Sequence, residues 1–157
     1  MVKKILKIIA IVLFTAVIVI QFFRIDKVNP PVVRDETIDA AMAVPPDISL
    51  IIGRSCNDCH SNQTIYPWYS NLQPMGWFLK NHIDNARKKL NFSVWNTYSP
   101  QKRSKKFEEI CEQLESREMP LPSYLWIHRD SILSDNDAKA LCDWAKLENS
   151  KMGEAAQ

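Results

Sequence analysis

Glycine is scarce in this chain of 157 residues, which has three glycines against nine prolines. A β-sandwich or a β-barrel needs many tight turns, and glycine supplies the positive backbone φ that such turns require. Helices joined by stiff, proline-containing connections suit this composition better. The composition therefore predicts an all-α fold, and the length leaves room for one domain.

Acidic residues are absent before Asp26, and Lys3, Lys4 and Lys7 are the only basic residues before Arg24. Removing these three lysines from the 20 basic residues of the chain leaves 17 against 18 acidic residues. The formal net charge of +2 therefore comes from the N-terminal segment. Nucleic-acid binding requires a strong basic excess, so we expect no nucleic-acid partner.

A long apolar run covers residues 5–23, interrupted by Lys7, Thr15 and Gln21. A helix of about 19 residues just spans a hydrocarbon core of roughly 30 Å. The lysines at its start predict, by the positive-inside rule, an N-terminus in the cytoplasm. A cleaved signal peptide is the alternative, but the run is long and no A-x-A site follows it. We expect a single-pass anchor in the cytoplasmic (inner) membrane and export of the rest to the periplasm.

Four sections follow from this pattern: an anchor over 1–24, a proline-containing stalk over 25–46, a helical domain over 47–148 and a disordered tail over 149–157. A short helix is expected in the stalk around Asp35–Met42. Within the domain we expect four helices, joined by irregular segments over 61–74 and 91–100. The first is capped by Asp47 and runs into Cys56, the second covers 75–90, the third covers 101–117, and the fourth runs from Ser134 to Glu148. The apolar stripe of the helix over 75–90 consists of Met75, Phe78, Leu79, His82, Ile83, Ala86 and Leu90.

Cysteines are also few, four in all, and two of them stand in the sequence Cys56-Asn57-Asp58-Cys59-His60. The pattern C-x-x-C-H is typical of covalent haem attachment. Two thiols bond to the two vinyl groups of the porphyrin, and the two-residue gap lets one helical turn present both sulfurs to the same edge. The adjacent histidine gives an imidazole nitrogen to the iron. We therefore expect one covalent haem c on Cys56 and Cys59, with His60 as an axial ligand.

Two other chemistries use a C-x-x-C pair. Zinc sites usually repeat the pair or add a spaced pair of histidines, whereas Cys111 and Cys142 are isolated and His82 and His128 lie far apart. A thioredoxin-like redox pair needs a strand–turn–helix setting, and no such pattern surrounds Cys56. The sequence favours haem over both.

The second axial position of the iron is expected to go to Met119. This residue follows the helix predicted over 101–117, and Pro120 and Pro122 make the segment after it stiff and extended. A thioether is a soft ligand suited to haem iron. The 59 residues between His60 and Met119 let the chain pass over the opposite haem face. Packing in the core also explains a methionine here.

Other residues compete for the same position. His82 lies on the apolar stripe of the helix predicted over 75–90, where a hydrogen-bonded core histidine explains it, and His128 suits a role in bridging a loop. Met75 is a further candidate that packing explains. An absent sixth ligand stays open as well.

Cys111 and Cys142 fall on the apolar stripes of the last two predicted helices. In an oxidising compartment they form a disulfide if their Cα atoms lie within about 7 Å, and two small buried apolar residues are the alternative. Trp68 and Tyr69, in the irregular segment 61–74, either line the haem or belong to the core.

From about Pro46 to Leu147 the chain resembles a bacterial haem-binding domain family related to the class I cytochromes c. The residues that carry the resemblance are Cys56–Ser61, Thr64, Pro67–Ser70, Leu90–Ser93, Trp95, Met119–Pro120, Tyr124, His128, Leu133–Ser134 and Asp143–Ala145. The resemblance implies a cytochrome c-like helical fold with haem on Cys56 and Cys59 and His60 on one face of the iron. By analogy with the late-loop methionine of class I cytochromes c, it implies Met119 on the other. It also implies attachment outside the cytoplasmic membrane, in agreement with the predicted export.

Six-coordinate iron with histidine and methionine ligands leaves no open position for a substrate. The leading hypothesis is therefore a membrane-anchored electron carrier with a redox partner protein, and not an enzyme. The alternative is a haem-based redox or small-ligand sensor in which Met119 is absent from the iron or leaves it. A peroxidase-like enzyme is less favoured, because the sequence offers one haem site and no obvious distal acid–base pair.

Overall fold

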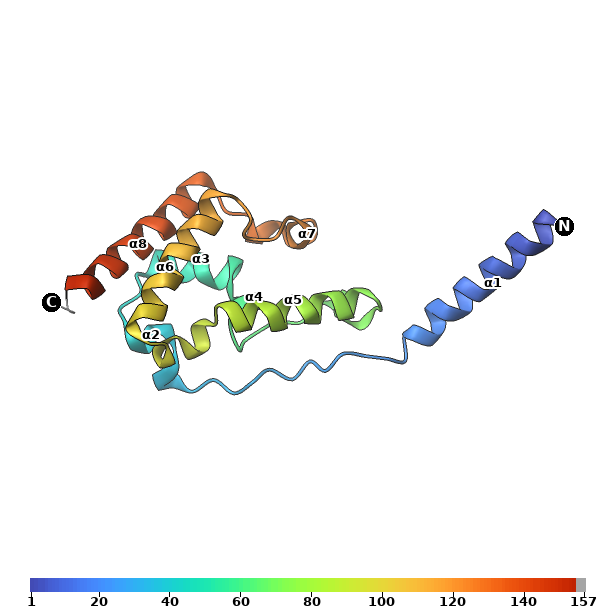
Figure 1. The fold of residues 1–157 in the computed structure, drawn as a ribbon, viewed down its shortest axis with the longest axis horizontal. Helices are drawn as coiled ribbons and strands as arrows, with labels where there is room; N and C mark the ends of the chain where they lie inside the picture. The colour runs from blue at the N-terminus through green and yellow to red at the C-terminus, as the bar shows by residue number, and fades with distance from the viewer. Residues whose placement is uncertain (155–157) are drawn as a thin grey trace.

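A computed structural model describes residues 1–154 of the chain, and every regular element among them is a helix (Figure 1). This confirms the predicted all-α class. The α-helices are α1 (Val2–Ile20), α2 (Ile38–Ala41), α3 (Pro46–Ser55), α4 (Asn57–His60), α5 (Met75–Lys89), α6 (Pro100–Glu115), α7 (Pro122–Leu125) and α8 (Asp135–Glu154). Short 3₁₀ helices are η1 (Arg34–Glu36), η2 (Trp68–Asn71), η3 (Phe92–Thr97) and η4 (Arg129–Ser131).

Helix α1 projects from one end of the molecule (Figure 1), and its apolar side chains are exposed on all sides. Lys3, Lys4 and Lys7 lie in its first two turns. Within the described part of the chain, no helix combines the length and the apolar character needed to cross a membrane. The single-pass anchor expected over residues 5–23 therefore stays a prediction.

The segment between α1 and η1 is extended, but it lies along the domain instead of standing clear of it. The Asn29 side-chain amide donates to the Thr64 carbonyl oxygen at 2.9 Å, and the Asn62 amide donates to the Pro31 carbonyl oxygen at 3.0 Å. The Arg87 guanidinium donates to the Asn29 Oδ1 at 2.7 Å. The predicted stalk is thus held against the domain by side chains of the stalk and of the domain.

Helix α3 begins two residues earlier than expected, with Pro45 and not Asp47 at its N-cap. The short helix predicted around Asp35–Met42 appears as η1 and α2. Helix α3 then begins at Pro46, and Asp47 lies in its first turn, so the predicted N-cap role of Asp47 is wrong. Proline is tolerated at this first position because the N–H groups of the first turn have no partner within the helix. The Asp47 carboxylate suits the positive end of the helix dipole.

The main hydrophobic core lies where α3, α6 and α8 pack together over η3. Helix α6 presents Phe107, Cys111 and Leu114 at positions i, i+4 and i+7, and all three are buried. The fully buried Trp95 of η3 packs on Phe107, with ring centroids 4.8 Å apart. A disulfide joins Cys111 to Cys142 of α8, with Cα atoms 4.8 Å apart. Packing and a covalent bond therefore fix α6 to α8.

A second, smaller apolar cluster lies between α5 and η2. Leu79 and Ile83 of α5 and Tyr69 of η2 are its buried members. Met75 and Phe78, which belong to the stripe predicted to be buried, are 45 % and 53 % exposed. The buried face of α5 is therefore narrower than the apolar pattern indicates.

Gly76 permits the close approach of α5 to η2. A Cβ atom at this position would lie 2.5 Å from the Ser70 carbonyl oxygen, well inside the normal contact distance. Only glycine allows the two elements to meet this closely.

Helix α8 begins with the predicted capping box. The Ser134 hydroxyl accepts from the Asp137 N–H at 3.1 Å, and the Asp137 carboxylate accepts from the Ser134 N–H at 3.0 Å. The helix continues past the predicted end near Glu148, because Met152 packs against the main core. Of the predicted disordered tail over 149–157, residues 149–154 are helical, and 155–157 lie outside the described residues.

Candidate functional site

The C-x-x-C-H residues lie at the break between α3 and α4. Cys56 leaves the helical conformation, with φ −124° and ψ −39°, and α4 then forms a single turn. The N–H groups of Cys59 and His60 both donate to the Cys56 carbonyl oxygen, at 3.1 and 2.9 Å. This turn brings the two thiols and the imidazole to the wall of one cavity.

A backbone carbonyl fixes the proton position of His60. Its Nδ1 lies 3.0 Å from the Leu90 carbonyl oxygen at the end of α5. A carbonyl oxygen only accepts, so Nδ1 carries the proton and Nε2 keeps a free lone pair. Burial lowers the pKa of His60, which keeps the ring neutral at neutral pH. Metal-binding histidines are commonly oriented by such a carbonyl group.

The two thiols of the turn are protonated at neutral pH. Burial raises the pKa of Cys56 to about 12, with a further contribution from Cys59. Burial and then the Asp58 carboxylate raise the pKa of Cys59 to about 11. Neither cysteine belongs to a disulfide. Among residues 1–154, no group of three or more His, Cys, Asp or Glu side chains is arranged to hold a bare metal ion.

A tight helix end brings Met119 to the site. After α6, the Arg117 N–H donates to the Leu114 carbonyl oxygen at 3.2 Å, and the Glu118 N–H donates to that of Gln113 at 3.1 Å. This pair of bonds defines a Schellman motif. Arg117 occupies its left-handed position, with φ 57°, where glycine is usual. The chain therefore reverses just before Met119.

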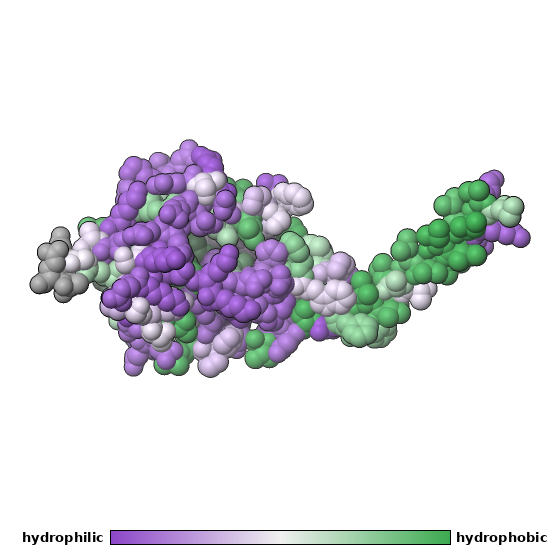
Figure 2. Space-filling view, in the orientation of Figure 1, coloured by the Kyte–Doolittle hydropathy of each residue, from purple (hydrophilic) through white to green (hydrophobic). Residues whose placement is uncertain are grey.

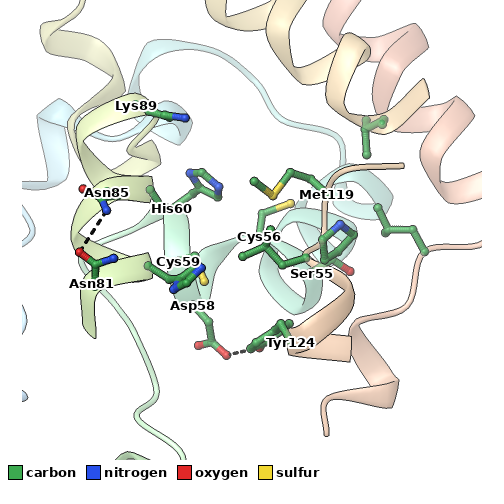
Figure 3. Close-up of a pocket in the computed structure, with 16 residues that line it drawn as sticks. Ser55, Cys56, Asp58, Cys59, His60, Asn81, Asn85, Lys89, Met119 and Tyr124 are labelled. Atoms are coloured by element: carbon green, nitrogen blue, oxygen red, sulfur yellow. Dashed lines mark hydrogen bonds between the residues drawn. The ribbon is translucent and has the colours of Figure 1, made fainter. Parts of the chain in front are cut away.

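Two adjoining cavities of about 320 and 440 Å³ share Cys56, His60 and Met119 in their walls. Figure 3 shows the Met119 side chain directed towards His60 and Cys56, from the opposite side to α4. The first cavity is also lined by Asn81, Asn85 and Lys89 of α5 and by Leu121 and Tyr124. Both volumes lie in the range of cofactor and small-molecule sites.

A chain of contacts ties α7 to the C-x-x-C-H turn. The Tyr124 hydroxyl donates to the Asp58 carboxylate at 2.7 Å (Figure 3). Its ring stacks on His128, with centroids 4.1 Å apart, and the His128 Nε2 lies 2.9 Å from the Tyr69 hydroxyl. Burial and the hydrogen bond to Asp58 raise the pKa of Tyr124, so the phenol stays a donor. Because Met119 precedes Tyr124 by five residues, this contact holds the Met119 segment against α4.

The other candidate residues differ in their positions. His82 lines the first cavity and its Nδ1 donates to a carbonyl oxygen of its own helix at 2.8 Å, so its Nε2 is available to the cavity. His128 bridges Tyr69 and Tyr124 and lines neither cavity. Met75 and Trp68 also lie outside both cavities, as does Tyr69.

Sequence reasoning missed several residues of the site. Asn81, Asn85 and Lys89 recur every four residues on α5, and this spacing was a usable signal because it places them on one helix face. The contact between Asp58 and Tyr124 had no local signal, because Asp58 occupies a variable position of the motif and the two are 66 residues apart.

The comparisons with known proteins add one finding. No curated protein and no solved structure gives a significant match. A family model described as a haem-binding domain matches residues 15–147, which is most of the chain and includes α3 to α7 with both cavities. The chain therefore belongs to the haem-binding domain family.

Proposed function

We propose that this protein binds one haem c covalently through Cys56 and Cys59, with His60 as an axial ligand of the iron. Family membership supports haem as the cofactor. The observation that carries covalent attachment is the single turn with two thiols outside any disulfide and an imidazole whose Nε2 is free, all lining one cavity. These donors fit haem, because thiols bond to its vinyl groups and imidazole binds its iron.

Cys56 and Cys59 would hold the haem, each by adding its thiol across one vinyl group. The sulfur would bond to one vinyl carbon and the thiol hydrogen would pass to the other, so the addition would need neither oxidant nor reductant. The raised pKa values of Cys56 and Cys59 keep that hydrogen on the sulfur before reaction. His60, next in the chain, would supply the lone pair of its Nε2 to the iron.

Met119 is the proposed second axial ligand, and electron transfer is the proposed role. The position of Met119 in the wall opposite α4 supports this assignment, because it would place a thioether across the cavities from the His60 imidazole. Bound haem supplies an iron centre that cycles between the ferric and ferrous states, and histidine with methionine ligation raises its potential. With both axial positions filled, the protein exchanges electrons with a redox partner protein and does not transform a substrate at the iron.

Lys89 is the proposed partner of a haem carboxylate. It lines both cavities and makes no ion pair within residues 1–154. A carboxylate at the edge of an apolar cavity is favoured by a nearby positive charge. The amides of Asn81 and Asn85 supply hydrogen-bond donors on the same helix face.

Attachment to the cytoplasmic membrane through α1 is a further part of the proposal, with the N-terminus in the cytoplasm and the haem domain in the periplasm. Exposed apolar side chains along all faces of α1 support it, because surfaces of this size mark membrane or protein contacts. Lys3, Lys4 and Lys7 favour a cytoplasmic N-terminus, and the Lys7 stem can carry its charge to the interface. Protease added to intact spheroplasts should digest the haem domain, whereas a protected domain contradicts this orientation.

Covalent attachment is tested by denaturing the purified protein in acidified organic solvent. The pigment should stay with the wild-type polypeptide and should be lost from the Cys56→Ala/Cys59→Ala variant. The Cys111→Ala/Cys142→Ala variant is the matched control, because it removes two disulfide-bonded cysteines outside the cavities and should keep the pigment. Extraction of pigment from the wild type refutes thioether attachment.

The axial ligand is tested by the weak far-red absorption band that a methionine–iron bond gives ferric haem. Met119→Ala should abolish this band, and Met75→Ala should keep it, because Met75 lines neither cavity. If the wild type lacks the band and its ferrous form binds carbon monoxide tightly, the protein fits a sensor with an open or labile position. If the wild type lacks the band, a change in its ferric absorption spectrum in the His82→Ala variant would assign the second axial position to His82.

A further inference from the structure

One end of the domain is built from two segments without any Asp, Glu, Lys or Arg. They are residues 59–79 and residues 119–128, and together they are called the uncharged end below. The hydrogen bond between Tyr69 and His128 joins the two segments. In a chain whose residues are 24 % charged, two such segments meeting in space form a surface with few charges, to which Lys27 adds an ammonium group that donates to Asn71 Oδ1.

Large apolar side chains are exposed at the uncharged end, and three of the five tryptophans of the chain are among them. Trp68 and Trp126 are 70 % and 73 % exposed, whereas Trp95 and Trp144 are buried in the main core. The exposed set consists of Ile65, Trp68, Leu72, Met75, Trp77, Phe78, Trp126 and Ile127. Tryptophan gathers at membrane–water interfaces, because its ring is apolar and its N–H seeks a polar partner.

Helix α1 meets the domain at this same end. The Gln21 side chain and the Gln73 backbone form two hydrogen bonds, at 2.9 and 3.0 Å, and the Trp77 ring N–H donates to the Phe23 carbonyl oxygen at 2.8 Å. Figure 2 shows apolar residues along α1 and where it joins the domain, whereas hydrophilic residues dominate the rest of that face. The apolar surface of the helix is therefore continuous with that of the uncharged end.

We infer that the uncharged end of the domain lies on the lipid bilayer, with Trp68, Trp77 and Trp126 among the headgroups. This inference rests on the proposed attachment of α1 to the membrane. Because the end of α1 is hydrogen-bonded to Gln73 and Trp77, burying α1 in lipid brings this surface to the bilayer. The scarcity of charge favours lipid over a protein partner, since complementary charges across a protein–protein interface give specificity and speed association.

This placement sets how the cofactor site faces the membrane. Phe78 of the uncharged end packs on His82, with ring centroids 4.1 Å apart, and His82 lines the first cavity. Leu121 and Tyr124 of the second segment line the same cavity. The first cavity therefore adjoins the uncharged end and, with it, the bilayer, whereas the wall of the second cavity also contains α6 residues.

The test places a nitroxide spin label on the full-length, haem-loaded protein in vesicles of phosphatidylethanolamine and phosphatidylglycerol. Trp68→Cys and Trp126→Cys put the label at the uncharged end, and Lys105→Cys puts it on α6, where the native side chain is 72 % exposed. The introduced thiol is the only free one, because the native cysteines are used by haem and by the disulfide. An unchanged haem spectrum shows that each variant folds.

Collision rates of the label with oxygen and with a water-soluble nickel complex then report its depth. At positions 68 and 126 the oxygen rate should exceed the nickel rate, and at position 105 the order should be reversed. Labels at 68 and 126 that behave like the label at 105, on protein that floats with the vesicles, overturn bilayer contact and leave the α1 attachment standing. Protein that fails to float overturns both.

Discussion

The two ends of the domain are stabilised in different ways. At the α6–α8 end, a large aromatic core, a disulfide and surface ion pairs such as Lys146–Glu115 fix the helices together. At the uncharged end, the buried apolar cluster is small, and hydrogen bonds such as those of Tyr69 with His128 and of Tyr124 with the neighbouring Asp58 hold the segments in place. The first end supplies stability, and the second positions side chains around the cavities. Substitutions at the first should therefore change unfolding, and those at the second should change the site.

The largest effect on stability is expected from removing the disulfide of the α6–α8 end. Cys111→Ala/Cys142→Ala opens a loop with a sequence separation of 31, which should cost roughly 3–4 kcal/mol of unfolding free energy. Guanidinium unfolding measures it, and the haem spectrum of the folded variant should not change. A variant as stable as the wild type would show that packing alone fixes α6 to α8.

At the uncharged end, Tyr124→Phe removes the hydrogen bond to the Asp58 carboxylate. Hydrogen bonds to charged groups contribute about 1.5–3 kcal/mol, so the Met119 segment should loosen. The far-red band of the ferric protein should disappear at a lower temperature than in the wild type, and carbon monoxide should bind the ferrous form faster. Absorption spectroscopy over a temperature ramp measures the first effect.

Tyr66→Phe is the matched control for this substitution. The Tyr66 hydroxyl is buried without a hydrogen-bond partner within the described residues, so its removal should leave stability and the band unchanged or slightly improved. Equal behaviour of the two variants would mean that Tyr124 does not position Met119.

The helix end before Met119 offers a smaller, stabilising change. Arg117→Gly removes the Cβ atom that strains the backbone at a left-handed position. This should raise the unfolding free energy by about 1 kcal/mol. The lost ion pair to Asp135 is largely exposed and contributes little. Thermal unfolding checks the sign, and a lower melting temperature would mean that the ion pair outweighs the backbone strain.

The smallest effect concerns the start of α8. Hydrogen bonds from Ser134, followed by the contact with Arg54, lower the pKa of Asp137. A carboxyl group with a lowered folded pKa stabilises the fold above its unfolded pKa, and this contribution is lost as the pH falls through the folded pKa. Asp137→Asn should therefore be slightly less stable at neutral pH and equal to the wild type in acid. A difference that persists in acid would contradict this origin.

The helices could be predicted where one face is apolar and the other charged. The spacing of Phe107, Cys111 and Leu114 gave α6 to within two residues at each end, and the Ser134 capping box gave the start of α8. Helix α5 was harder, because Met75 and Phe78 extend its apolar pattern beyond the face that the protein buries. A helical pattern does not tell whether an apolar side chain meets protein or another apolar surface.

Some residues of the site could also be predicted from the sequence, and others could not. The C-x-x-C-H spacing determines one turn, so Cys56, Cys59 and His60 follow from local sequence. The Leu90 carbonyl that orients His60 lies 30 residues away, and Tyr124 lies 66 residues from Asp58. Such partners depend on how α5 and α7 pack, which no local pattern encodes.

The hydrogen bonds that hold residues 24–33 to the domain restrict how far the domain can move relative to α1. A flexible chain of ten residues would have a root-mean-square end-to-end distance of roughly 17 Å, and the domain could move over this range. If α1 lies in the membrane as proposed, the hydrogen bonds of Asn29 with Thr64 and Arg87 restrict this range and fix the height of the site above the lipid. Electron exchange would then be limited by sideways encounters in the plane of the membrane, so its rate should follow the fluidity of the lipid and the crowding of its partners.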